Sequence, residues 1–465
     1  MKKLSQALFI ALGTASLVCA PNIFATNGYF THGSGTKNKG MAGAGIAMPE
    51  EAMAISNNPA SALLVGDRFE AGASLFSPSR SYSSSTSQAQ GNGGAFTIGP
   101  NNLDSAREYF VIPHLAYTNQ LSDISAWGVA FYGRGGMNTK WEGGTATFDP
   151  DGQGTQFPVV TLPGTFGAGT AGVDLSQAFL DLSYARQLSE NFTAGISAIA
   201  VAQVFEAKGV NNFAGFTESF VNNFFATGMP DPSVVKNLTN NGHDNSIGFG
   251  AKIGFHSSLS PTVTLAGSYQ TEIGMSELDE YADLFAEKGG FDIPANAKFG
   301  LSFNPGNNVV WNLDIEHTWF SDVSSVGNSI SNLFSCPTLN PSSMSPAGCL
   351  GGANGAGFGW DDMTVFKLGA QWGGSNGWTW RAGYSHGEQP ISENEVTFNI
   401  LAPAVIEDHI TFGFTKETAS NRELNFAFMY ALNNSVKGNN NFDPTQTIEL
   451  EMDQFELELS YTWKF

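Results

Sequence analysis

The chain has 465 residues, with 21 Lys and Arg against 42 Asp and Glu, which gives a formal net charge of −21. Charged residues make up only 14% of the chain, whereas about 25% is usual for a soluble domain. The acidic excess argues against a nucleic-acid binder, because phosphate would be repelled, and the 42% hydrophobic content excludes a disordered chain. So few charges in so large a chain indicate that much of the surface does not face water.

The first 25 residues are typical of a secretory signal peptide. Lys2 and Lys3 form a basic start, residues 7–18 are apolar, and residues 23–25 fit a cleavage site. No later stretch has the roughly 20 consecutive apolar residues that a transmembrane helix needs. If the chain spans a membrane, it must therefore do so as a closed barrel, because open sheet edges cannot be satisfied in lipid.

Several segments alternate between apolar and polar residues, as the strands of a barrel do. The clearest segments are 309–320, 422–432 and 456–465. A water-soluble sandwich also alternates, so the spacing of the segments matters more. The following stretches read as fourteen strands: 67–82, 107–118, 124–134, 175–186, 192–206, 245–256, 262–273, 293–304, 308–320, 362–373, 378–387, 405–416, 421–432 and 449–465.

The gaps between these strands alternate between short turns and long polar loops, which is typical of outer-membrane barrels. We therefore predict an all-β fold, a 14-stranded antiparallel transmembrane β-barrel over residues 67–465. Residues 26–66 do not alternate and are rich in Gly and small apolar residues. Because about 40 residues are too few for a core of their own, we predict that they form a mostly helical hatch, or plug, in the lumen.

Cys336 and Cys349 are the two cysteines that follow the signal peptide. They lie in a Ser-, Pro- and Gly-rich stretch without a nearby His, so we expect a disulfide rather than a metal site. Residues 214–226 read as a helical insertion that carries Phe216 and Phe220 at i, i+4 spacing. Its apolar face either lines an outer ligand groove or packs over the barrel mouth.

Four features together resemble the long-chain fatty acid transporters of bacterial outer membranes, a family that includes importers of aromatic hydrocarbons. They are Asn27-Gly28-Tyr29-Phe30, the Gly-rich residues 40–45, the triplet Asn58-Pro59-Ala60 and the terminal Phe465. The resemblance implies passive import of hydrophobic compounds through a hatch-filled barrel. Ligand would bind in a lumenal apolar pocket near the mature N-terminus and leave sideways, where a kinked third strand breaks the pairing.

The resemblance also implies roles for particular residues. Tyr29 and Phe30 would contact ligand. Phe216 and Phe220 are further candidate ligand contacts because of their spacing in the insertion, not because of the resemblance. The hatch and gate would comprise Asn58, Pro59, Ala60, Gly133, Gly135 and Gly136. Our alignment puts Asn212 and Asp361 where the fatty-acid importer has basic residues. Lys208 and Lys367 lie nearby as candidate partners for a carboxylate, so both a fatty acid and a neutral hydrocarbon remain open.

Two other classes compete. One is a nonspecific porin-like or surface-loop barrel. The other is an outer-membrane lipase that uses Ser375, in a Gly-rich turn, or His386. The turn lacks the helix that a nucleophile elbow needs, and no histidine shows HExxH spacing. We therefore expect no enzyme activity, no catalytic residue, no metal and no cofactor.

The expected location is the bacterial outer membrane, with both termini in the periplasm. The expected partners are a hydrophobic small molecule, outer-membrane lipid and, through the C-terminal strand that ends at Phe465, the barrel assembly machinery. We expect a monomer and no nucleic-acid partner.

Overall fold

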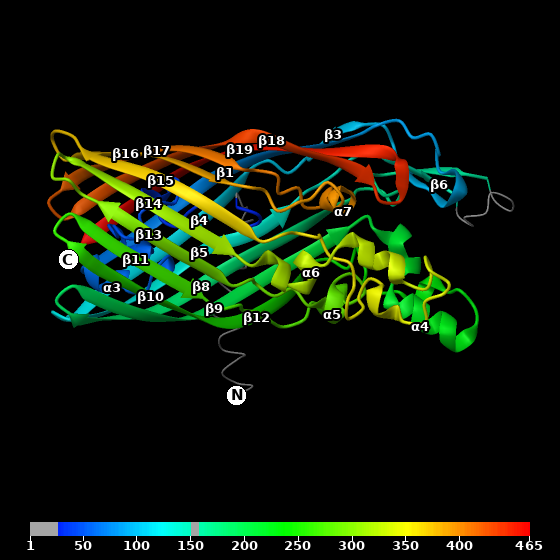
Figure 1. Cartoon of the computed structure of the whole chain (residues 1–465), viewed down its shortest axis with the longest axis horizontal. Coiled ribbons are helices and arrows are strands. Elements are labelled where there is room, and N and C mark those ends of the chain that lie inside the picture. Colours follow the sequence, from blue (N-terminus) through cyan, green and yellow to red (C-terminus); the bar gives the residue numbers. More distant parts are fainter. Residues whose placement is uncertain (1–26, 150–157) are drawn as a thin grey trace.

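A computed structural model describes residues 27–149 and 158–465, so the predicted signal peptide lies outside the described residues. Fourteen strands pair in sequence order into a closed antiparallel barrel, and β19 returns to β1 with Arg68 opposite Lys464. The barrel strands are β1 (Arg68–Ser84), β4 (Phe110–Ser122), β5 (Ser125–Asn138), β8 (Gly172–Ser189), β9 (Phe192–Lys208), β10 (Asp244–Ser260), β11 (Val263–Gln270), β13 (Asn296–Phe303), β14 (Val309–Thr318), β15 (Met363–Gly373), β16 (Trp378–Gly387), β17 (Asp408–Ala419), β18 (Arg422–Asn440) and β19 (Asp443–Lys464). The predicted strand number and closure are confirmed (Figure 1).

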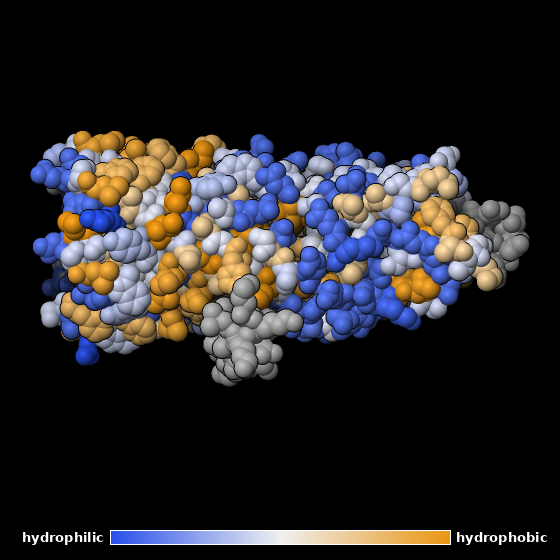
Figure 2. Space-filling view, turned by 90° about the horizontal axis from the view of Figure 1, so that it is seen from below, coloured by the Kyte–Doolittle hydropathy of each residue, from blue (hydrophilic) through white to orange (hydrophobic). Residues whose placement is uncertain are grey.

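Successive side chains of a strand point to opposite faces, so the alternation of polar and apolar residues decides which side chains face the lumen. On β14, Asn312 and Asp314 are buried inside the barrel, whereas Leu313 and Ile315 are exposed on its outer wall. In Figure 2, apolar residues gather over the half of the molecule that carries the short turns, and hydrophilic residues dominate the half with the long loops. This distribution fits an apolar belt in lipid below a water-exposed extension.

The strands differ greatly in length. β19 has 22 residues and spans about 70 Å along its own direction, whereas β13 has 8. The predicted strands 421–432 and 449–465 are therefore too short, because β18 and β19 continue beyond the lipid belt. In that extension the outward side chains are polar, so the apolar alternation on which the prediction rested ends before the strands do.

The long loops carry short elements at one end of the barrel (Figure 1). Three strands form a separate small sheet, and two others add to the edges of β1 and β10. The strands are β2 (Phe96–Ile98), β6 (Thr145–Phe148), β7 (Val160–Pro163), β3 (Asn102–Asp104) and β12 (Gly274–Met275). The helices are η2 (Asn92–Gly94), η3 (Asn211–Phe216), α4 (Glu218–Thr227), η4 (Pro232–Val234), η5 (Asp279–Tyr281), α5 (Ala286–Gly289), η6 (Phe320–Asp322), α6 (Ser324–Gly327), η7 (Ile330–Ser335), η8 (Pro346–Gly348) and α7 (Val396–Asn399). Within the described ranges, no helix is long and apolar enough to cross a membrane.

Residues 27–66 lie inside the barrel and are buried almost throughout. They contain the three short helices α2 (Thr36–Lys39), η1 (Ala52–Ser56) and α3 (Ser61–Leu64). These helices contact barrel strands on opposite sides, including β5, β8 and β18. We call residues 27–66 the hatch.

Candidate functional site

The barrel wall is incompletely paired between its second and third strands, β4 and β5. β4 pairs with β1 as far as Phe110, but β5 pairs with β4 only up to Tyr132. Pairing of β5 with β8 continues to Asn138, with a register shift between Gly133 and Gly135. The end of β5 thus leaves β4 and presents a free edge, at the place where the sequence suggested a bend.

The start of the hatch covers this free edge. The backbone N–H of Thr31 donates to the carbonyl of Arg134 (2.9 Å), and that of Gly136 donates to the carbonyl of Tyr29 (3.0 Å). Phe30 forms the bridge between these two hydrogen bonds. Residues 29–31 therefore add to β5 as a short strand, which is a common way to satisfy an open sheet edge.

Tyr29 and Phe30 are buried, with exposed fractions of 1% and 2%. The ring centroid of Tyr29 lies 5.3 Å from that of Phe320, 5.8 Å from that of Trp360 and 6.2 Å from that of Phe291. Burial raises the pKa of the Tyr29 hydroxyl well above its usual value. The free edge of β5 is therefore covered from inside by a cluster of aromatic rings.

An apolar cavity of about 40 Å³ lies on the side of this cluster that faces the long loops. It is lined by Phe166, Val173, Phe205, Val210, Phe213, Leu284, Phe285, Ser325, Leu350, Ala356, Gly357, Phe358, Phe398 and Leu401. The lining contains no charged side chain, and the volume holds only about three water molecules. A larger molecule could fit here only if lining side chains moved apart.

Aromatic rings connect the cavity to Tyr29. Phe205 and Phe285 line the cavity, and their ring centroids are 4.7 Å apart. The ring centroid of Phe291 is 4.9 Å from that of Phe285 and 6.2 Å from that of Tyr29. These contacts form a continuous row of packed aromatic rings from the cavity to the edge of β5 that residues 29–31 cover, and we call this row the apolar route.

Between this route and the end with the short turns, the lumen is filled by the hatch and by buried ion pairs. Lys37 lies 2.7 Å from Glu423, and Lys39 lies 2.5 Å from Glu456 and 2.6 Å from Glu458. Further pairs join Arg381 to Glu50 and Lys252 to Asp181. Separating buried ion pairs costs free energy that contact with an apolar molecule does not return. The packed part of the lumen toward the short turns therefore disfavours an apolar molecule.

The triplet Asn58-Pro59-Ala60 lies where the hatch meets β9 and β10. Asn58 donates from Nδ2 to the carbonyl of Phe255 (3.0 Å) and accepts the N–H of Ala60 at Oδ1 (3.0 Å). A Cβ atom on Gly195 would overlap Ala60 and Pro59. The triplet is therefore seated by side-chain hydrogen bonds and by the small size of the wall residue.

The two lysines proposed for a carboxylate ligand are both paired with protein carboxylates. Lys208 is half-exposed and lies 2.9 Å from Glu206. Lys367 is buried, lies 2.6 Å from Glu316 and donates to the carbonyl of His32 (2.8 Å). Neither lysine lines the apolar cavity.

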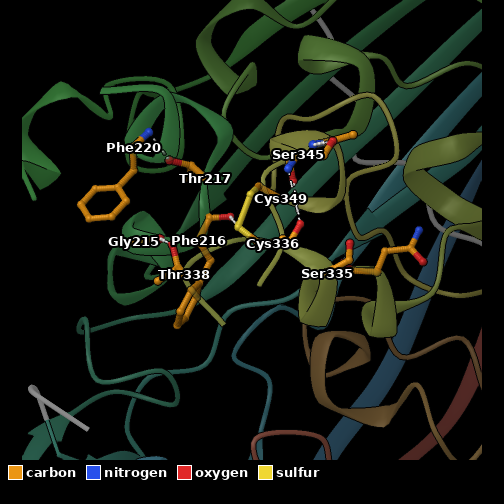
Figure 3. The surroundings of a disulfide bond; sticks show 12 residues. Gly215, Phe216, Thr217, Phe220, Ser335, Cys336, Thr338, Ser345 and Cys349 are labelled. Carbon is orange, nitrogen blue, oxygen red and sulfur yellow. Dashed lines mark hydrogen bonds between the residues drawn. A yellow bond between two sulfur atoms is a disulfide. The ribbon is translucent and has the colours of Figure 1, made fainter. Parts of the chain in front are cut away.

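Phe216 and Phe220 are partly buried and pack against the edge of the aromatic core, outside the cavity lining. A disulfide joins Cys336 and Cys349 beside them (Figure 3). Thr338, inside the loop that the disulfide closes, donates to the carbonyl of Gly215 (2.7 Å). The disulfide-closed loop therefore fixes the turn that leads into α4.

Ser375 and His386, the two candidate lipase residues, are far apart. Ser375 lies in the turn before β16, whereas His386 lies near the other end of that strand, about 25 Å away at the usual rise per residue. His386 instead lies 2.9 Å from Asp408. In the described part of the chain, no group of His, Cys, Asp or Glu is suited to hold a metal ion.

Sequence reasoning missed most of the cavity and of the aromatic route. Phe205 had a readable signal, because it is an inward-facing position of a predicted strand. Phe285 lies between the predicted strands 262–273 and 293–304, and nothing in the sequence showed that it reaches the lumen. Phe291 lies outside the predicted strands and had no periodic signal. Phe320 was the last residue of the predicted strand 308–320, on its lumenal face, but it lies in η6 in the structure.

A closed barrel with an apolar belt, short turns at one end, long loops at the other and a plugged lumen defines an outer-membrane transport channel. The sequence model of the "Outer membrane protein transport protein (OMPP1/FadL/TodX)" family matches residues 17–462. The chain belongs to this family, whose members are outer-membrane transport proteins and not enzymes.

Solved structures with the same fold include the toluene transporter TodX of Pseudomonas putida, with 17% identity, a TM-score of 0.60 and coverage of 93% of this chain and 99% of that one. A FadL homologue of Pseudomonas aeruginosa has 15% identity, a TM-score of 0.62 and coverage of 94% and 100%. The toluene transporter TbuX of Ralstonia pickettii has 16% identity, a TM-score of 0.59 and coverage of 93% and 99%. No curated protein sequence matches the chain.

Proposed function

We propose that this barrel imports uncharged hydrophobic molecules and releases them sideways into the outer membrane. The observation that carries the proposal is that an apolar route runs from the loop end to the free edge of β5, while ion pairs fill the lumen below it. Ligand would enter the cavity, pass Phe285 and Phe291, and reach Tyr29. Detachment of residues 29–31 from β5 would then open the wall toward lipid.

An uncharged substrate is favoured over a fatty acid because the cavity lining lacks a cation. A buried carboxylate would need a charged or strongly hydrogen-bonding partner, and neither Lys208 nor Lys367 lines the cavity. Toluene-sized hydrocarbons, which the similar transporters TodX and TbuX carry, fit this chemistry better. Since the barrel closes within one chain, we propose that a monomer suffices for transport.

Uptake by intact cells tests the proposal. Cells that produce the protein should take up radiolabelled toluene at least tenfold faster than cells without it, whereas oleate uptake should not change. Equal acceleration of oleate would contradict the preference for an uncharged substrate. Absence of any acceleration for toluene would contradict the import function itself.

A further inference from the structure

Two residues that line the apolar cavity are partly exposed, and the other lining residues are buried. The two are Phe398, on α7, and Leu284, between η5 and α5. A ligand that comes from water must pass a side chain that borders both water and the cavity, so these residues mark the two candidate entrances. In Figure 1, α7 and α5 lie on opposite sides of the loop end, and the two entrances are therefore distinct.

Aromatic rings continue outward from Phe398. Its ring centroid lies 6.1 Å from that of Phe442, in the turn between β18 and β19, and the ring centroid of Phe442 lies 5.8 Å from that of Phe334. Phe334, on η7, is 41% exposed. On its inner side, the ring of Phe398 lies 5.4 Å from that of Phe213, which is buried in the cavity lining. We call Phe334, Phe442 and Phe398 the entrance row, because they lead from water to the cavity.

Hydrogen bonds hold the residues on both sides of Phe398. Thr397 donates from Oγ1 to Oδ1 of Asn441 (2.8 Å) and accepts the N–H of Asn441 at the same oxygen (3.1 Å). Asn399 donates from Nδ2 to the carbonyl of Phe358 (2.6 Å). The backbone of α7 is therefore fixed to other loops, whereas the phenyl ring of Phe398 is held by packing alone. Such a ring can change its rotamer without breaking a hydrogen bond.

Polar contacts tie two loops together on the side of Leu284. Lys288 forms an ion pair with Glu218 of α4, and Asp283 accepts a hydrogen bond from the hydroxyl of Ser219. An entrance here would require α4 to separate from the segment that carries Leu284, and an apolar molecule offers no hydrogen bond in return. The side of Phe398 is therefore the easier way in for an uncharged substrate.

We propose that substrate enters the cavity past Phe398, whose ring is the gate, and that Phe334 and Phe442 are the first side chains it contacts. An apolar molecule gains free energy when it leaves water and covers exposed aromatic surface. Rotation of the Phe398 ring then exchanges its contact with Phe213 for contact with the substrate. Because α7 is anchored, the opening is limited to the space that one phenyl ring vacates, which favours substrates with a single ring. This inference rests on the proposed function, since it adds an entrance to the same cavity.

Initial uptake of radiolabelled toluene and naphthalene by intact cells, at matched amounts of protein in the outer membrane, tests the gate. Phe398→Ala removes the ring and should raise the ratio of naphthalene uptake to toluene uptake at least threefold over the wild type. Leu284→Ala is the matched control, because it shortens the other partly exposed side chain of the lining. It should leave the ratio unchanged.

Phe334→Asp tests the outer end of the entrance row. A carboxylate there should lower toluene uptake at least fivefold, because an apolar molecule gains little by contact with a charged group. Phe225→Asp is the matched control, because Phe225 lies on α4, on the side of Leu284, and is 43% exposed against 41% for Phe334. Its toluene uptake should change less than twofold.

The entrance is refuted if Phe398→Ala leaves the ratio unchanged or if Leu284→Ala raises it equally. It is also refuted if Phe334→Asp lowers toluene uptake no more than Phe225→Asp does. In these cases, acceleration of toluene uptake by the wild type would still support the proposed function. If the wild type does not accelerate toluene uptake at all, the proposed import function fails as well.

Discussion

Gly254 of β10 lies so close to Asn58 of the hatch that a Cβ atom on residue 254 would overlap Oδ1 of Asn58. Other glycines of the barrel wall lie equally close to the hatch. A Cβ on Gly128 would lie 2.9 Å from Ile55, and one on Gly413 would lie 3.0 Å from Cα of Gly40. Inward-facing glycines thus allow the hatch to approach the wall more closely than any side chain would permit.

We expect Gly254→Val to displace Asn58 and loosen the hatch. Overpacking of this kind typically costs about 1–3 kcal/mol, so the thermal midpoint in detergent should fall and protease should cut residues 27–66 faster. Gly274→Val is the control, because a Cβ on Gly274 meets no atom within 4 Å. Equal protease resistance of the two variants would argue against a tightly seated hatch.

Lys39→Met should open the lumen to ions. It leaves Glu456 and Glu458, exposed by only 3% and 1%, without their cation, and loss of one partner of a buried pair costs about 3–5 kcal/mol. The hatch should then occupy its seat less often, and single-channel recordings in planar bilayers should show larger and more frequent openings than the wild type.

Neutralising both carboxylates provides the control for this effect. The triple variant Lys39→Met/Glu456→Gln/Glu458→Gln should return toward the closed behaviour, because no unpaired charge remains. A wild type that already conducts as a wide open pore would instead support the porin-like alternative.

A charge in the cavity should stop transport without harming the barrel. Phe285→Asp places a carboxylate among apolar side chains, so toluene uptake should fall at least tenfold, whereas Phe285→Leu should keep most of it. Initial uptake rates at matched amounts of protein in the outer membrane measure the difference. Similar rates for the two variants would show that ligand does not pass this cavity.

Removal of the disulfide should affect the loops and not the barrel. In the chain-entropy model, the short closed loop contributes about 3 kcal/mol, and it holds the turn before α4 through Thr338. The double variant Cys336→Ser/Cys349→Ser should expose residues 330–350 to protease while the thermal midpoint of the barrel stays the same. A lower midpoint would mean that these loops support the barrel wall.

The strand number, the inward and outward faces and the lumenal position of the hatch were readable from the sequence, because lipid and water impose opposite demands on alternate residues. The glycines near residue 135 also predicted a local bend. The addition of residues 29–31 to β5 was not readable, since backbone hydrogen bonds leave no trace in residue types.

Lys208 and Lys367 show a second limit of prediction from the sequence. Glu206 and Lys208 share one face of β9, so their pairing could have been read from the i, i+2 spacing. Lys367 and Glu316 lie on different strands, and their contact depends on register. Whether Lys367 can meet a ligand carboxylate therefore depends on contacts that only the fold determines.

We propose that ligand leaves through the wall where residues 29–31 cover β5. Phe30 and Gly135 face each other there as a non-hydrogen-bonded antiparallel pair, a geometry with about 4.5 Å between Cα atoms that suits a disulfide. Phe30→Cys/Gly135→Cys, in a background in which Cys336 and Cys349 are replaced by Ser, should lock the hatch onto β5. The same background with Gly135→Cys alone is the control, because a Cβ atom on residue 135 would overlap Oε1 of Gln177.

The direct measurement is toluene uptake by the locked variant before and after reduction. We expect oxidation to lower the initial rate at least tenfold and a reducing agent to restore it, with no change in the control. Uptake that proceeds at the same rate with the cross-link intact would contradict lateral release at this site.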